Sequence, residues 1–532
     1  MTCSATNDDG SDQEPSLKPS KRTCSSPCYK RDSVLQDFGC YELKVLVISQ
    51  LSYVPITCTM LSTAFYEPNQ MTCVSLNLAK NGSSRQPQKA TGADFISLLF
   101  EWDEACQNSV ITAIMSTSLM VGALAGSFLA GWLADAYGRL PVLKGCLLLN
   151  CIVNGVFSLI ATASRPLSAV ILFILGTGCG GYMVTNLVLL VECLDRPRSR
   201  LLAVSLNGWS FSMVIFSLQV LAWISQHWFL FHVLIALMAF VAFLSYHFWV
   251  LESCRWLAGA HYPAEARCTA IQVMLCRSRE LRLGDDWQWW QILGFSEPVI
   301  STPAISKDLL RKYTYKDLFR HSSVYIPLLA LCYCFISSSL VSFGFYFNAD
   351  VLPGNRYLNM ILMGMSKFLM GLLPFAVSSV VGRRPIMLFS LLVASAGAWF
   401  AVTSQLLAVS SEHWSLTAVS LVVSAALDPA WKINHLYSAE LFPTVVRNMA
   451  RAVCNVGARF GSVVAPMVVH LRAVHYLIPY LTFASFLSVQ VLVVALFIPE
   501  TKDRPLPQEL PITKDNRGVE EVMEQNLNAQ SA

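Results

Sequence analysis

The segment GWLADAYGR, residues 131–139, lies between two long apolar stretches and shows how the chain is organised. Its last two residues, Gly138-Arg139, recur as Gly382-Arg383, 244 residues later and again between apolar stretches. Two other landmarks repeat at a spacing of 248 residues, namely Glu192 with Glu440 and Glu252 with Glu500. A repeat this regular predicts two homologous halves that arose by duplication.

The composition places these halves in a membrane. Apolar residues make up 54% of the chain and charged residues only 14%, whereas about 25% of the residues in a soluble protein are charged. A helix needs roughly 20 apolar residues to cross the hydrocarbon core. Twelve such stretches can be drawn, at about 45–62, 109–132, 143–163, 167–191, 201–225, 228–250, 323–347, 358–381, 386–408, 413–436, 452–470 and 476–498.

Six of these stretches precede a polar segment and six follow it. We therefore predict an all-α membrane protein with twelve transmembrane helices in two six-helix bundles. The predicted parts are a tail, an N-terminal bundle, an inter-bundle loop, a C-terminal bundle and a second tail, at 1–42, 43–250, 251–322, 323–498 and 499–532.

Lys and Arg in short connections predict the orientation, because they favour the cytoplasmic side of a membrane. They concentrate in alternate connections, on the side of both termini: Arg139, Lys144, Arg196, Arg198, Arg200, Arg383, Arg384 and Arg447. The short connections on the other side carry few, chiefly Arg165, Arg356 and Arg472. Both tails are therefore expected in the cytoplasm, at the plasma membrane, with the loop 63–108 outside the cell.

The loop 63–108 carries features expected of an extracellular segment. It holds the only glycosylation sequon of the chain, which predicts a glycan on Asn81; the alternative is an unused surface tripeptide. Three of the 17 cysteines, Cys58, Cys73 and Cys106, lie in or beside this loop. Two of them are expected to form a disulfide and the third to stay a thiol.

Charges around the repeated turns are expected to control access from the cytoplasm. Asp135 and Arg139 can pair with charges at neighbouring helix ends and latch the inner face shut. Anchoring by positive charge alone would explain Arg139 but not Asp135. The run ELFPTVVRN, residues 440–448, places Glu440 and Arg447 on either side of a helix break imposed by proline.

These segments, with LESCRWL at 251–257 and PETKDRPLP at 499–507, closely resemble the organic ion transporter family, of the solute carrier family 22 type, within the major facilitator superfamily. The resemblance covers roughly residues 40–510 and is most specific at 440–448. It implies the major facilitator fold and polyspecific movement of small organic ions across the plasma membrane by alternating access. The residues assigned to gating are Asp135, Gly138, Arg139, Glu192, Arg198, Arg200, Glu252, Arg255, Gly382, Arg383, Glu440 and Arg447.

Four departures from the family pattern bear on gating. The family usually has Pro where Cys254 stands, a second Arg where Leu140 stands, and Arg where Ser199 stands between Arg198 and Arg200. Its outer loop is also longer. These departures leave open a non-transporting receptor or scaffold on the same fold.

Ionisable residues inside the predicted spans indicate the charge of the substrate, because each costs about 2.5–3.5 kcal/mol to insert. The interiors of the first six spans contain no Lys, Arg, Asp or Glu, so their lining is expected to be apolar. Arg459, in the second half, lies twelve residues past Arg447, about 18 Å deeper and near the midplane. Anion carriers of the family resemble one another in having Arg at this position, and cation carriers in having Asp.

Three further charges and three aromatic residues complete the candidate cavity. Lys367 falls where cation carriers of the family resemble one another in having Glu; alternatively, it reaches the outer interface. Asp428 and Lys432 are four apart on one helix, either as a mutually neutralised pair or with Asp428 as a proton-coupling group. The aromatic residues expected to line the cavity, unless they only fill the membrane core, are Trp223, Phe343 and Tyr346.

Three of the four buried charges are positive, so we expect a cavity that prefers anions. The sequence therefore predicts a polyspecific secondary transporter of small organic ions, in particular anions, driven by gradients or by exchange with a counter-ion. The alternatives are a cation or zwitterion (carnitine-like) transporter and the non-transporting scaffold.

Other chemistry is not expected. The glycine-rich run 176–181 lies within a span and lacks the Gly-Lys-Ser/Thr ending of a phosphate loop, so it predicts close helix packing rather than a nucleotide cofactor. Cys24 and Cys28 lack a second ligand pair, which argues against a metal site. The net charge of +4 comes mostly from cytoplasmic loops and gives no support to nucleic-acid binding. We do not expect an enzyme.

Overall fold

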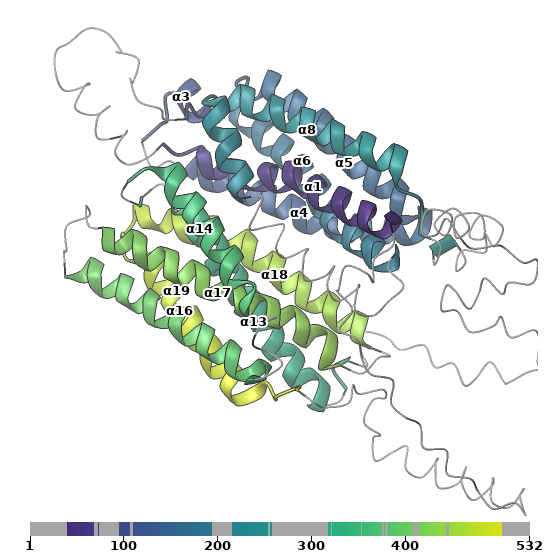
Figure 1. Ribbon diagram of the computed structural model, residues 1–532. Coiled ribbons are helices and arrows are strands. Elements are labelled where there is room, and N and C mark those ends of the chain that lie inside the picture. Colours follow the sequence, from purple (N-terminus) through teal and green to yellow (C-terminus); the bar gives the residue numbers. More distant parts are fainter. Residues whose placement is uncertain are drawn as a thin grey trace, which may run out of the picture.

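The computed structural model consists of helices arranged in two bundles that lie side by side (Figure 1). Ten helices among the described residues are long and apolar enough to cross a membrane, which confirms the expected all-α membrane protein. The structure describes residues 40–68, 73, 95–106, 110–193, 215–253, 256–257, 318–320, 322–349, 351–352, 354–374, 377, 381–407, 414–442 and 446–502.

The first bundle, purple to teal in Figure 1, holds five of these ten helices. A short apolar helix, Ile215–Ser225, covers the part of the predicted span 201–225 that the structure describes. The labelled elements are α1 (Cys40–Leu61), η2 (Ser62–Phe65), α3 (Leu98–Glu101), α4 (Val110–Tyr137), α5 (Arg139–Ile160), α6 (Arg165–Cys193) and α8 (Trp228–Trp249).

The second bundle, green to yellow in Figure 1, holds the other five long helices. It also contains α14, which covers only part of the predicted span 358–381. The labelled elements are α13 (Ser322–Phe347), α14 (Arg356–Met370), α16 (Arg383–Leu406), α17 (Trp414–Glu440), α18 (Arg447–His470), η4 (Leu471–Ala473) and α19 (Ile478–Phe497).

Helices α4 and α6 approach each other through small residues. A Cβ added at Gly126 would lie 2.0 Å from the carbonyl oxygen of Thr177, and one at Gly180 would lie 1.9 Å from that of Ala123. Only glycine tolerates such an approach. The glycine-rich run 176–181 is therefore a helix-packing motif, as predicted.

The ends of the helices define two faces. The face that carries Gly138, Gly382 and the ends of α6 and α17 is the predicted inner face. The face that carries the end of α1, the start of α14 and the end of α18 is the predicted outer face. Cys73 and Cys106 form a disulfide beside the predicted outer face, while Cys58 is a buried thiol, so the expected single bridge with one thiol left over is confirmed.

Candidate functional site

The turn between α4 and α5 is built on one glycine. Helix α4 continues to Tyr137, so residues 131–137 are helical and Gly138 alone makes the turn, with φ +108°. The Glu252 carboxylate accepts the main-chain N–H groups of Arg139 (3.2 Å) and Leu140 (3.0 Å) at the start of α5. A Cβ at Gly138 would lie 2.7 Å from Glu252 Oε2. Glycine is therefore favoured by the backbone conformation, and a side chain at this position would also shift the Glu252 carboxylate.

The Arg139 side chain completes a circuit around this turn. Its guanidinium pairs with Glu192 at the end of α6 (3.2 Å) and with Asp135 at the end of α4 (2.8 Å). Together with Glu252, which follows α8, these contacts connect the inner ends of α4, α5, α6 and α8. We call Arg139, Glu192 and Glu252 the first rim circuit.

The second bundle repeats the circuit with the corresponding residues. Gly382 has φ +91°, and Glu500 accepts the N–H groups of Arg383 (3.1 Å) and Arg384 (2.8 Å) at the start of α16. The Arg383 guanidinium pairs with Glu440 at 2.8 Å. We call Arg383, Glu440 and Glu500 the second rim circuit. The duplicated sequence landmarks thus form the same set of contacts twice.

Each circuit connects helices of a single bundle. The described ion pairs at the predicted inner face therefore hold each bundle together, and among the described residues they do not join one bundle to the other. The side chains of the remaining predicted gating residues lie outside the described part of the chain, and their role stays a prediction: Arg198, Arg200, Arg255 and Arg447.

The two rim carboxylates differ in their electrostatics. Burial raises the pKa of Glu252 above its ordinary value, although hydrogen bonds from Ser253, Leu140 and Arg139 act in the opposite direction. Burial also acts to raise the pKa of Glu500, but hydrogen bonds from four main-chain N–H groups outweigh it, so the pKa of Glu500 is lowered. The protein thus stabilises the charged form of Glu500 more than the charged form of Glu252.

The departure at Leu140 also separates the two rims. Leu140 contributes its main-chain N–H to Glu252, whereas Arg384, at the corresponding place, adds a side-chain hydrogen bond to the carbonyl of Ala495 at the end of α19. The second rim therefore has a tie to its last helix that a leucine side chain cannot make.

Lys367 is buried inside the second bundle. Its Nζ donates to Tyr346 Oη at 2.6 Å and Ser342 Oγ at 2.8 Å, both on α13, and lies 4.3 Å from the centre of the Tyr346 ring. Lys367 is only 3% exposed, so the alternative of a lysine that reaches the outer interface is wrong. Its hydrogen-bond partners lie on the neighbouring helix and hold the ammonium group inside the protein.

The expected pair on α17 is formed. Asp428 Oδ2 lies 3.0 Å from Lys432 Nζ, and both side chains are largely buried. The pair packs on Gly371 after α14, where a Cβ would lie 2.2 Å from Lys432 Nζ and 2.3 Å from Asp428 Oδ2. Asp428 also interacts electrostatically with Lys367. One carboxylate thus lies among two ammonium groups in a cluster with a net positive charge.

Arg459 faces the first bundle. Its Nη2 contacts Met183 Sδ on α6 of the first bundle at 3.2 Å. Gly461, on the same helix, packs against the carbonyl oxygen of Ile336, which sets α18 close to α13. Arg459 therefore lies at the interface of the two bundles, where alternating-access carriers bind their substrates.

The aromatic candidates differ in their surroundings. Tyr346 is fully buried and holds Lys367, and Phe343 packs edge-on to it with ring centres 6.4 Å apart. Trp223 lies on the short helix Ile215–Ser225 and is 59% exposed. A role of these rings in contacting a substrate stays a prediction.

The first bundle contains a buried network of uncharged polar groups that the sequence analysis missed. His232 Nδ1 lies 2.8 Å from Asn154 Oδ1, Asn154 Nδ2 donates to Asn150 Oδ1 at 2.7 Å, and Thr59 Oγ1 donates to the same oxygen at 3.1 Å. All four residues are buried. The interior of the first bundle is therefore not wholly apolar, because a count of Lys, Arg, Asp and Glu overlooks neutral hydrogen-bonding side chains, and the expected apolar lining stays a prediction.

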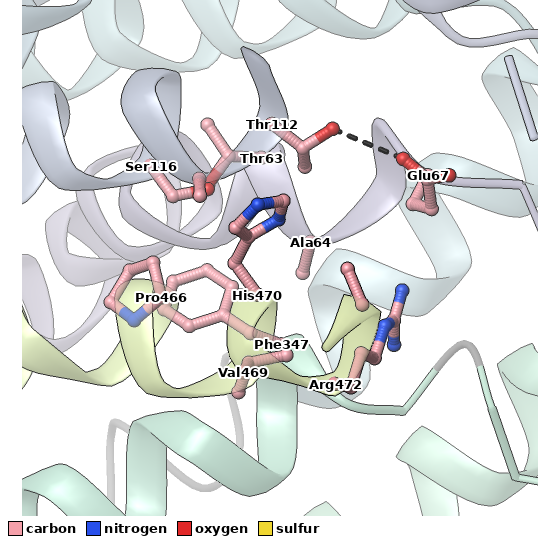
Figure 2. Close-up of a pocket in the computed structure, with 12 residues that line it drawn as sticks. Thr63, Ala64, Glu67, Thr112, Ser116, Phe347, Pro466, Val469, His470 and Arg472 are labelled. Carbon is pink, nitrogen blue, oxygen red and sulfur yellow. Dashed lines mark hydrogen bonds between the residues drawn. The ribbon is translucent and has the colours of Figure 1, made fainter. Parts of the chain in front are cut away.

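A small cavity lined by both polar and apolar residues lies between the bundles at the predicted outer face (Figure 2). Thr63, Glu67 and Ser116 line it from the first bundle, and His470 and Arg472 from the second. Thr112 Oγ1 donates to Glu67 Oε2 at 3.1 Å across its rim. Its volume of about 40 Å³ has room for water but not for an organic ion.

Comparisons with known proteins complete the description of the site. Residues 59–509 match the family described as sugar (and other) transporter. Solute carrier family 22 member 15-like of Xenopus laevis is 27% identical to this chain over 429 residues, which make up 78% of this chain and 82% of that protein. Organic anion transporter 3 of Homo sapiens is 25% identical and covers 78% of this chain and 73% of its own. Solute carrier family 22 member 3 of Mus musculus is 26% identical, with corresponding coverages of 77% and 71%.

A similar solved structure is the xylose transporter XylE from E. coli in a partially occluded, inward-open conformation. It has a TM-score of 0.60 and 16% sequence identity, and the match covers 88% of this chain and all of XylE. At this identity the likeness concerns the fold.

Proposed function

This chain belongs to the sugar (and other) transporter family of the major facilitator superfamily, and from that premise we propose that it moves small organic anions across the plasma membrane by alternating access. Its fold is the major facilitator fold predicted from the sequence, and its family is one of transporters rather than enzymes. The relatives over most of its length are named as solute carrier family 22 members and organic anion transporters.

The observation that carries the anion preference is the position of Arg459. Its guanidinium projects from α18 of the second bundle to Met183 of the first, at the surface that both bundles share. A guanidinium presents several N–H donors in a planar fork, which suits a carboxylate or sulfate and repels a cation. In a site removed from bulk water this attraction is stronger than at a protein surface.

The charges behind Arg459 support the same preference. Three further charged groups lie in the interior of the second bundle, namely Lys367, Lys432 and Asp428, and two of them are cationic. The first bundle contributes neutral polar groups to its interior, such as His232 and Asn154. An organic anion between the bundles would thus lie beside a positive second bundle and a neutral first bundle.

The rim circuits suit a machine with two rigid halves. Each circuit binds the inner ends of several helices of one bundle together, so that the bundle can rotate as a unit about the substrate. Asp428 and Lys432 are the candidate coupling pair, since a change in the charge of either would alter the field at the shared interface.

An uptake panel tests the proposal. Cells that express the full chain are given labelled organic anions, cations and zwitterions of similar size, and uptake is compared with that of mock-transfected cells. We expect anion uptake above the mock level and little cation uptake. Selective uptake of cations or zwitterions would replace the anion assignment, and no flux of any compound by protein at the cell surface would favour a receptor or scaffold.

A further inference from the structure

Arg356 bridges the two bundles at the predicted outer face. It is the first residue of α14, and its side chain extends to the end of α1 and η2. Its Nη1 donates to the carbonyl oxygen of Glu67 at 2.7 Å, and its Nη2 donates to that of Ala64. Arg356 is 6% exposed, so these contacts are shielded from water.

The carbonyl oxygens that accept from Arg356 lie at the end of a helix, a place that stabilises a cation. Ala64 lies in η2 and Glu67 just after it, directly beyond α1, where main-chain carbonyl groups at the end of a helix carry partial negative charge. The planar guanidinium can donate to two carbonyl groups at once. It also lies 5.0 Å from the centre of the Phe65 ring, a distance at which a cation and an aromatic face attract each other.

Neighbouring contacts join the same two surfaces. The ring of Tyr357 stacks on that of Phe65, with centres 6.2 Å apart and an angle of 27° between the planes. Gln219 Nε2, on the short helix Ile215–Ser225, donates to Met360 Sδ at 3.3 Å. The start of α14 therefore contacts the first bundle through Arg356, Tyr357 and Met360.

The contact of Arg356 lies beside the small cavity between the bundles. Ala64 and Glu67, whose carbonyl groups it binds, are also lining residues of that cavity (Figure 2). These two residues therefore form part of one wall of the cavity, and their position limits its volume. A movement that draws α14 away from η2 would widen the space between the bundles on this side.

We propose that Arg356 is the lock of the outer gate: it holds the bundles together at the predicted outer face, and its release opens the path to the substrate site from that side. Because alternating access requires the two faces to open in turn, a contact between the bundles at one face must break in each cycle. The proposal rests on the proposed transport function. It gives Arg356 a positioning role. From the sequence alone, Arg356 was only one of the few positive charges in the short outer connections.

A thiol-accessibility experiment tests the lock without any substrate. Ser116→Cys places a reporter in the cavity, where Ser116 is buried in the closed arrangement. Intact cells are treated with a membrane-impermeant thiol reagent, and the rate of labelling is measured with Arg, Lys or Gln at position 356. The chain without the reporter gives the background. Val474→Cys, at a site that is 78% exposed on the same face, shows that the reagent arrives.

We expect Arg356→Gln to raise the labelling rate of the Ser116→Cys reporter about 10-fold, and Arg356→Lys to give an intermediate rate. A 10-fold change corresponds to about 1.4 kcal/mol in the equilibrium between closed and open outer gate. The matched control is Arg165→Gln. Arg165 lies on the same face but pairs with Glu104 of its own bundle at 2.6 Å, so its loss should leave the rate unchanged.

Equal labelling rates with Arg and Gln at position 356, or an equal rise in Arg165→Gln, would overturn the proposal. If Arg356→Gln does not reach the cell surface, Phe65→Leu takes its place. It removes the ring beneath the guanidinium and should raise the rate about threefold, and an unchanged rate would overturn the lock. Unchanged labelling with intact uptake would refute the lock and leave transport standing, whereas increased labelling without uptake of any compound would refute transport and leave the lock standing.

Discussion

The two bundles share a rim but differ inside. At the predicted inner face each bundle has a glycine turn, an arginine and two glutamates in the same contacts. In the interior, the first bundle holds a neutral network around His232 and the second holds charged groups around Lys367 and Arg459. We infer that the shared rim holds each half together as a unit and that the charged interior of the second half is its contribution to the proposed substrate site.

The largest effect on stability is expected from removing the arginine of either rim. Arg139→Ala removes the ion pair of Glu192, and Arg383→Ala removes the ion pair that Glu440 makes with Arg383, both at largely buried positions. Each change should destabilise the protein by about 3 kcal/mol, because it breaks a largely buried ion pair by removing one partner. The apparent Tm in detergent measures the loss, with the corresponding Lys variants as controls. A lowered Tm in only one of the two Ala variants would show that the two circuits do not contribute equally to stability.

A smaller effect is expected from replacing the turn glycines. Gly138→Ala and Gly382→Ala force a side chain into a conformation with φ of +108° and +91°, which costs about 1–3 kcal/mol. The new Cβ would also displace Glu252 or Glu500 from the helix start. Gly131→Ala is the control, since Gly131 lies inside α4 with open space around its Cα. Wild-type Tm in both turn variants would contradict the structure of the rim.

The smallest effect separates the two rim glutamates by pH. The raised pKa of Glu252 means that its charged form lowers the free energy of unfolding at pH values above that pKa. This cost disappears as the pH falls through the pKa and the carboxylate becomes protonated. The lowered pKa of Glu500 means that its contribution is fully present above the unfolded value of about 4.3 and is lost as the pH falls through the folded value. Glu500→Gln should therefore destabilise the protein more than Glu252→Gln at pH 7.

Because Glu500 is partly exposed, solvent screening keeps that difference below about 1 kcal/mol. The apparent Tm of the wild-type protein and both variants, measured from pH 7 down to about pH 3, should show a Glu500→Gln deficit that is constant above the unfolded pKa of about 4.3 and shrinks below it. A deficit that grows as the pH falls, or a larger deficit in Glu252→Gln at neutral pH, would contradict the assignment.

The sequence predicted the rim residues because the duplication repeats them at spacings of 244 and 248 residues, as with Glu192 and Glu440. It did not predict that Glu252 binds main-chain N–H groups, since a pattern of side chains carries no information on the main-chain groups that they meet. Nor did it predict that each circuit stays within one bundle, because spacing along the chain does not say which helices face each other. The pairing of Cys73 with Cys106, with Cα atoms 5.4 Å apart, likewise needed three-dimensional distances.

Residues inside the membrane were predicted in part. Asp428 and Lys432 were expected to meet because four residues span about one helical turn. The network of His232, Asn154 and Asn150 was missed because none of these side chains carries a formal charge at pH 7. Arg356 was counted only for the orientation of its loop, since its partners are main-chain carbonyl groups of a distant segment.

The most direct test of anion preference by the second bundle is uptake by Arg459→Asp, with Arg459→Lys as the variant that keeps the charge. We expect Arg459→Asp to lose anion uptake about 10-fold or more and to gain cation uptake. It would remove the charge-assisted hydrogen bonds proposed between Arg459 and an anionic substrate, each worth about 1.5–3 kcal/mol, and would reverse the charge at the interface. Arg459→Lys should keep part of the anion uptake. If Arg459→Asp reaches the cell surface with anion uptake unchanged and no cation uptake, the site does not select its substrate by the charge of Arg459.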